Sequence, residues 1–169
     1  TQSDGTVSTT FSGVEDYTGN YDFTGVILNV NNALTVGGTT EISNTGLFTK
    51  NGTGTISSTG AFTQNDAGAN SLGANITTTN TNLSFQTGIT LTNSVQLSTG
   101  AGAGNITLSS TVNPAAASTQ GLTLLAGTGN ISVTGPVGNT LRLGALTVTS
   151  GATVGFTGAV TAASYTQSD

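Results

Sequence analysis

The sequence predicts an all-β protein that folds as a solenoid of parallel coils, roughly seven in number, with essentially no α-helix. Three observations lead to this fold. Short segments alternate apolar residues with Thr or Ser, similar stretches recur along the C-terminal half (101–112, 126–137 and 150–160), and glycines separate the segments. Alternation with a period of two is typical of a β-strand. The similar stretches recur every 23–25 residues, and a repeat of that length favours a solenoid over a sandwich or barrel.

The composition favours an ordered β-rich chain over a disordered one. The 169 residues include 34% hydrophobic and only 5% charged residues, the net charge is −5, and Thr, Val and Ile are abundant. Disordered chains usually combine low hydrophobicity with a high net charge and few β-branched residues. The low hydrophobicity therefore does not indicate disorder here.

The repeats are clearest in the C-terminal half. AGAGNITLSSTV at 101–112 matches AGTGNISVTGPV at 126–137, and SGATVGFTGAV at 150–160 aligns its Val160 with Val137. A second alternating segment precedes each of these stretches: VQLST at 95–99, LTLLA at 122–126 and LTVTS at 146–150. One coil thus consists of a short strand, a glycine-bearing corner, a second strand and a looser return.

A second repeat lies nearer the N-terminus. LFTKNGTGTIS at 47–57 is followed closely by AFTQNDAGANS at 61–71, and the closing SYTQSD has the same shape. We expect Phe48, Phe62 and Tyr165 to occupy equivalent inward places, because one apolar ring per coil is normal for a core. An exposed aromatic strip that binds sugars is the alternative.

The alternation also predicts which side chains are buried and which face outward. We expect the buried set to include Phe48, Phe62, Leu124, Ile131, Val133, Val148 and Phe156. Thr, Ser and Asn between the apolar positions should line the outside. Among them, Asn75, Asn105 and Asn130 are expected to bridge corners by bonding exposed main-chain groups. The two basic residues, Lys50 and Arg142, are expected to point into solvent.

The two ends of the chain carry the same motif. Thr-Gln-Ser-Asp occupies residues 1–4 and again residues 166–169. We interpret 1–169 as a single solenoid segment that forms one 165-residue unit of a tandem array. Its expected partners are neighbouring copies of the same repeat, placed end to end, either covalently or by stacking of subunits.

The chain resembles the filamentous-haemagglutinin-like repeats of giant bacterial surface proteins. The likeness lies in SLGANITTTNTNLSFQTGITLTNSVQLSTGAGAGNITLSSTVN (71–113) and LTLLAGTGNISVTGPVGNTLRLGALTVTSGATVGFTGAVTAASYTQS (122–168). It covers most of 47–169 and is weaker in 10–45. The resemblance implies a right-handed parallel β-helix in a secreted adhesin or filament at the bacterial cell surface, without catalytic residues.

Several function classes have little support in the composition. The chain has no His and no Cys, which removes the imidazole base, the thiolate nucleophile and the usual zinc ligands. Two basic residues cannot neutralise a row of phosphates, so we expect no nucleic-acid binding. No apolar run is long enough for a membrane span, and any export signal is expected outside this segment. We expect no enzymatic activity and no cofactor.

One acidic segment carries the candidate site residues. VEDYTGNYDF at 14–23 holds three carboxylates near two tyrosines. The candidate Ca²⁺ ligands are Glu15, Asp16 and Asp22, and the candidate glycan contacts are Tyr17 and Tyr21. Solvated charges on a loop are the other interpretation, because the spacing of these ligands is unspecific.

The function that we expect is that of a non-enzymatic stalk or filament segment that supports adhesion or contact between cells. The alternative is a module that binds host or partner-cell glycans through the 14–23 loop. A minor alternative is an ice-binding face, suggested by the Thr pairs at 77–79, 90–92 and 147–149. Thr is, however, a usual outward residue of β-strands.

Overall fold

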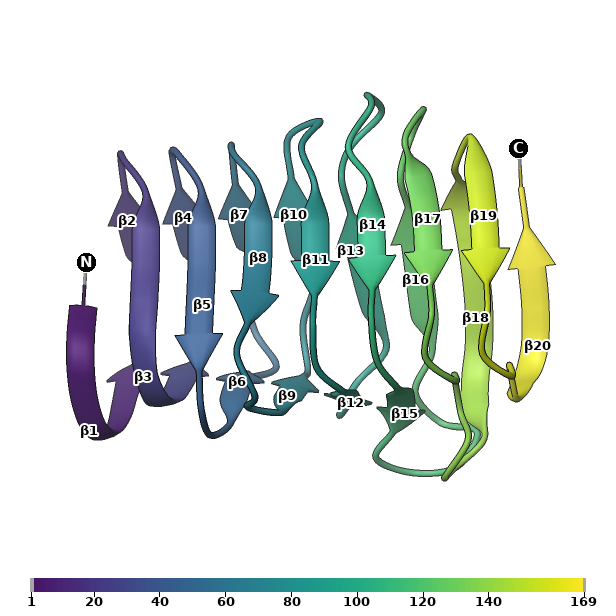
Figure 1. The fold of residues 1–169 in the computed structure, drawn as a ribbon, viewed down its shortest axis with the longest axis horizontal. Coiled ribbons are helices and arrows are strands. Elements are labelled where there is room, and N and C mark those ends of the chain that lie inside the picture. The colour runs from purple at the N-terminus through teal and green to yellow at the C-terminus, as the bar shows by residue number, and fades with distance from the viewer. Residues whose placement is uncertain (1, 169) are drawn as a thin grey trace.

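All strands of the chain pair in parallel and stack as a β-solenoid of about seven turns. The computed structural model describes residues 2–168, and their side chains from Ser8 onward. Within this part there is no helix, and consequently no helix that could cross a membrane. Figure 1 shows the coils side by side along the long axis, with the two ends of the chain at opposite ends of the stack. The predicted fold class is confirmed.

Each coil crosses three faces. Face 1 consists of β1 (Gln2–Phe11), β3 (Tyr21–Val30), β5 (Thr40–Asn44), β8 (Phe62–Asn65), β11 (Leu83–Phe85), β14 (Ile106–Leu108), β17 (Asn130–Val133) and β19 (Thr153–Phe156). Face 2 begins with the second halves of β1 and β3 and continues through β6 (Phe48–Lys50), β9 (Asn70–Leu72), β12 (Ile89–Leu91) and β15 (Val112–Pro114). Face 3 consists of β2 (Glu15–Tyr17), β4 (Leu34–Val36), β7 (Ile56–Ser58), β10 (Ile76–Thr78), β13 (Val95–Ser98), β16 (Leu122–Leu125), β18 (Leu143–Ser150) and β20 (Ala162–Gln167).

The pairing register reproduces the C-terminal sequence repeats. Ile131 pairs with Ile106 on one side and with Val154 on the other. Single bridges join Val112 to Val137 and Val137 to Val160. Equivalent apolar residues of successive repeats therefore stack directly on one another. Each spacing between the repeated stretches is thus the number of residues in one coil of the structure.

The core is a set of inward apolar columns. Six of the seven residues predicted to be buried are at most 1% exposed: Phe48, Phe62, Leu124, Ile131, Val133 and Val148. The seventh, Phe156, is half-buried and packs against the core. It lies in the last coil of face 1, where no described strand covers it from the far side.

The predicted equivalence of three aromatic residues is wrong. Phe48 lies on face 2 and Phe62 on face 1, whereas Tyr165 lies on face 3 and is 51% exposed. The physical reason is coil length. Adjacent coils of face 3 pair Ile56 with Ile76, which is a longer step along the chain than the one from Phe48 to Phe62. The offset between the two similar stretches is thus less than one coil and carries the chain onto another face.

The two terminal motifs also lie on different faces. Gln2 pairs with Phe23 on face 1, whereas Gln167 pairs with Val148 on face 3. In this structure the two copies therefore do not occupy equivalent places in a coil. The 165-residue tandem unit remains a prediction.

Candidate functional site

The three candidate calcium ligands are separated by the alternation of the strands. In β2, Glu15 is half-buried and Asp16 is exposed. Asp22 lies on face 1, where it pairs in register with Glu41 of the next coil. The described residues contain no group of three or more carboxylate, His or Cys side chains that could hold a metal ion. The structure thus does not bring these carboxylates together.

The two candidate tyrosines belong to an aromatic cluster at the first coils. The ring of Tyr21 lies 5.2 Å from that of Tyr17 and 5.7 Å from that of Phe11. Tyr21 is only 4% exposed, and its hydroxyl has no hydrogen-bond partner among the described residues. Burial raises the pKa of both tyrosines, and the charge of Glu15 adds to the shift. Tyr21 is therefore a core residue, and only Tyr17 is partly accessible.

Lys50 is buried, contrary to the prediction that it points into solvent. Its side chain has no exposed surface and lies between Val30 and Leu72, with which Lys50 pairs on either side in face 2. The reason is parity along β6, since Lys50 follows the inward Phe48 by two residues. Every second residue of a strand faces the same side.

Among the described residues, only main-chain oxygens accept hydrogen bonds from the Lys50 ammonium. Nζ donates to the carbonyl oxygens of Asn51 at 2.7 Å, Thr53 at 2.8 Å and Val30 at 3.4 Å. Burial lowers the pKa of Lys50 to about 8. Lys50 thus ties the corner after β6 to the core at the cost of burying a cation.

A buried polar cluster lies one corner away, between faces 1 and 2. The Gln64 amide donates to Asn44 Oδ1 at 2.8 Å and accepts from Asn70 Nδ2 at 3.2 Å and from Thr87 Oγ1 at 3.1 Å. Gln64, Asn44 and Asn70 are at most 1% exposed. The sequence prediction placed Asn outside and missed this cluster. The alternation of the strand did indicate it: Gln64 follows the inward Phe62 by two residues, so both side chains face the core.

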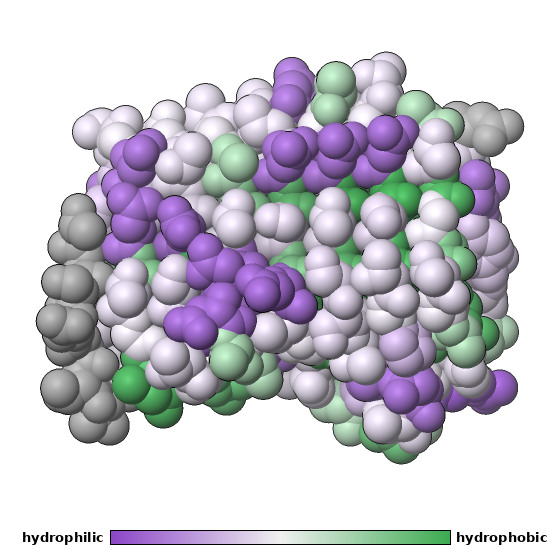
Figure 2. All heavy atoms as spheres, viewed as in Figure 1, coloured by the Kyte–Doolittle hydropathy of each residue, from purple (hydrophilic) through white to green (hydrophobic). Residues whose placement is uncertain are grey.

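Asparagine side chains connect successive coils on the outside. Asn82 Oδ1 accepts from the Asn105 N–H at 2.9 Å, and Asn105 Oδ1 accepts from the Asn130 N–H at 2.8 Å. On face 3, Asn75 Oδ1 accepts from the Gln96 N–H at 2.8 Å. The bridging role predicted for Asn75 and Asn105 is confirmed, whereas Asn130 contributes its main-chain N–H. Figure 2 shows a hydrophilic row along this edge of face 1.

Arg142 points outward, as predicted. Its Nε donates to Ser118 Oγ at 2.8 Å, and the Ser118 N–H donates to the Arg142 carbonyl oxygen at 2.6 Å. The guanidinium therefore joins the loop before β18 to the loop between β15 and β16, one coil earlier.

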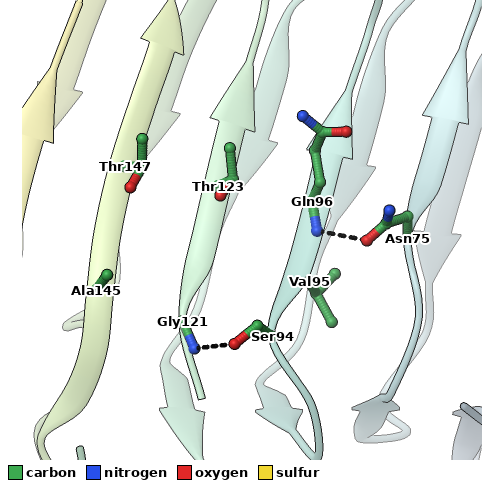
Figure 3. Close-up of a pocket in the computed structure, with 8 residues that line it drawn as sticks. All are labelled: Asn75, Ser94, Val95, Gln96, Gly121, Thr123, Ala145 and Thr147. Carbon is green, nitrogen blue, oxygen red and sulfur yellow. Dashed lines mark hydrogen bonds between the residues drawn. The ribbon is translucent and has the colours of Figure 1, made fainter. Parts of the chain in front are cut away.

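A shallow hollow of about 260 Å³ lies on the outside of face 3. It is lined by Asn75, Ser94, Val95, Gln96, Gly121, Thr123, Ala145 and Thr147. Figure 3 shows that the Asn75 and Ser94 oxygens are already occupied by the N–H groups of Gln96 and Gly121. Because no titratable side chain lines it, the hollow offers neutral hydrogen-bonding groups and no acid or base.

No protein-family model, curated protein or solved structure matches the chain. The likeness to filamentous haemagglutinin therefore depends on the sequence motifs quoted above.

Proposed function

We propose that this chain is a non-enzymatic stalk segment of a secreted bacterial surface protein, built from filamentous-haemagglutinin-like repeats. The observation that carries the proposal is the continuity of the ladders. Face 3 alone runs without interruption through eight strands from β2 to β20. Strands in a sheet lie about 4.8 Å apart, so seven coils make a spacer of about 34 Å.

The mechanism is mechanical. In a parallel solenoid each main-chain hydrogen bond between strands joins one coil to the next, so a pull along the axis is shared by three ladders. The apolar columns and the asparagine bridges, such as that from Asn82 to Asn105, connect the same coils. The segment would hold a distal binding region away from the cell.

Neighbouring copies are the proposed partners along the axis. Tyr165 pairs with Leu146 in an inward column, yet Tyr165 is 51% exposed because no described coil follows. The ring centroids of Tyr165 and Phe156 lie 6.2 Å apart in an edge-to-face arrangement. A further coil, supplied by a covalent repeat or by a stacked subunit, would bury both rings. Such contact should depend little on salt, because few charges take part.

Glycan binding through the 14–23 segment is the second candidate. It is favoured by the partial accessibility of Tyr17, and Tyr17→Ala is the variant that tests it. Tyr21→Ala is unsuitable, because removing a buried ring would disturb the fold. An ice-binding face has less support, since the three Thr pairs do not share one face: Thr90 lies on face 2, whereas Thr77 and Thr147 lie on face 3. Thermal hysteresis measurements would decide that alternative.

The experiment that tests the stalk function displays a reporter adhesin on cells through zero, one or two copies of the segment. The stalk proposal predicts that the reach of the reporter grows with each copy. It also predicts that cells carrying the segment without the reporter do not adhere. Adhesion by the segment alone, lost in Tyr17→Ala, would favour the glycan-binding module instead.

A further inference from the structure

The corner after β6 contains the single Asn-Gly pair of the sequence, Asn51-Gly52. Both residues are exposed. A Cβ built on Gly52 would meet one atom, Asn93 Nδ2 at 3.5 Å, so the space beside this residue is open. Among the described residues, the Gly52 N–H has no hydrogen-bond acceptor. This main-chain nitrogen is therefore free to react.

The peptide group that contains this nitrogen is contacted by a cation. The carbonyl oxygen of Asn51 and the nitrogen of Gly52 belong to one peptide group, and Lys50 Nζ donates to that oxygen at 2.7 Å. An ammonium on the oxygen stabilises the negative charge that the group acquires when its nitrogen loses a proton. Lys50 thus makes the Gly52 N–H more acidic and raises the fraction of the nitrogen that is deprotonated and able to attack.

We propose that Asn51 is a self-modification site, at which Lys50 promotes closure of a succinimide between Asn51 and Gly52. The Gly52 nitrogen attacks Asn51 Cγ, a new C–N bond forms, and the bond from Cγ to Nδ2 breaks. Nδ2 leaves as ammonia with the proton released from the Gly52 nitrogen. Water then opens the ring at either carbonyl and leaves aspartate or isoaspartate at position 51. No redox partner is needed.

The modification would change a contact between coils. Asn51 Nδ2 donates to Asn31 Oδ1 at 2.6 Å, and Asn31 lies one coil earlier at the same corner. Both products lose this donor and carry a new carboxylate at position 51. Isoaspartate also lengthens the main chain of the corner by one atom.

The test follows the native chain in warm neutral buffer by peptide mapping with mass spectrometry. Asn93, which is also exposed and precedes Ser94, is the internal control. Asn51 is expected to convert several-fold faster than Asn93. Gly52→Ala should slow the conversion several-fold without disturbing the fold, because its Cβ makes only an ordinary contact. Equal rates at Asn51 and Asn93 would overturn the proposal.

Two further comparisons test the part played by Lys50. Lys50→Met should slow conversion at Asn51 in the folded protein and leave it unchanged in denaturant, where the contact with the Asn51 oxygen is lost. The unmodified chain should also convert faster at Asn51 when folded than when denatured. Slower conversion in the folded chain, or no effect of Lys50→Met on the folded protein, would show that Lys50 does not assist.

Discussion

Lys50 lies directly beside Leu72 in the parallel register of face 2, so a lysine and a leucine occupy the same inward place in adjacent coils. The leucine contributes apolar area to the column, whereas the lysine brings in a charge that must be desolvated. Main-chain oxygens of Val30, Asn51 and Thr53 compensate this charge in part, and no carboxylate side chain among the described residues bonds to it.

The first prediction concerns the pH dependence of stability. Lys50 has a pKa of about 8 in the fold and 10.5 as its ordinary value. Between these values the unfolded chain binds a proton that the folded chain has released. The free energy of unfolding should therefore rise with pH above about pH 8. Urea denaturation at a series of pH values measures it, and Lys50→Met should remove the rise.

The same variant is predicted to be more stable than the parent at neutral pH. Replacing a buried charge by an apolar side chain of similar volume often stabilises a protein, and a gain of about 1 kcal/mol or more is expected here. The carbonyl oxygens that it frees at Asn51 and Thr53 belong to exposed residues and can bind water. A clear loss of stability at neutral pH would mean that the contacts of Nζ outweigh its desolvation.

The second prediction concerns Tyr21. Its hydroxyl is buried and has no hydrogen-bond partner in the part of the chain that the structure describes, so Tyr21→Phe should leave stability unchanged or raise it by about 1 kcal/mol at neutral pH. Because the pKa of Tyr21 is raised above the ordinary 10.0, the unfolded chain should lose its proton first, and stability should fall above about pH 10. Tyr21→Phe should weaken this fall more than Tyr17→Phe, as thermal melts across this range would show.

The third prediction compares two phenylalanines of one inward column. Phe85 is fully buried in the middle of face 1, whereas Phe156 is half-buried in its last coil. Phe85→Ala should cost about 3–5 kcal/mol, because neighbouring coils cannot collapse into the cavity, and Phe156→Ala should cost clearly less. Equal losses in denaturant titrations would mean that a further coil or subunit already covers Phe156.

The fourth prediction concerns the asparagine bridges. Asn105→Ala removes the acceptor of the Asn130 N–H and should cost about 1 kcal/mol. Hydrogen exchange at the Asn130 amide should become faster at the same time. Asn130→Ala is the matched control, since the Asn130 side chain is exposed and makes no hydrogen bond among the described residues. Unaltered exchange in Asn105→Ala would argue against the bridge.

The coil register could be predicted where apolar residues repeat with their neighbours. Ile106, Ile131 and Val154 fall at regular offsets within similar stretches, and the structure stacks them. The repeat around Phe48 and Phe62 led to a wrong prediction of equivalent positions, because its two copies lie on different faces of the coil. Similar local sequence there reflects the same demand for an inward ring followed by a polar corner, and does not mark a whole coil.

The polar interior could not be predicted from residue type. Parity placed Lys50 and Gln64 inward, but a charged or amide side chain in a strand usually points to solvent. These buried polar side chains are stabilised by hydrogen bonds to main-chain oxygens of the corners, such as those of Asn51 and Thr53 for Lys50. Those partners depend on the path of the loops, which the alternation of the strands does not specify.

Single-molecule pulling of the segment along its axis tests the central claim most directly. A load-bearing stack of coils should hold its length at low force and then lengthen in discrete steps. Each step should release one coil, such as the stretch from Ile56 to Ile76 or the longer one from Leu97 to Leu124. In each stretch the two end residues pair with each other in adjacent coils. Smooth lengthening from the lowest forces, as for a chain without stacked ladders, would contradict the stalk function.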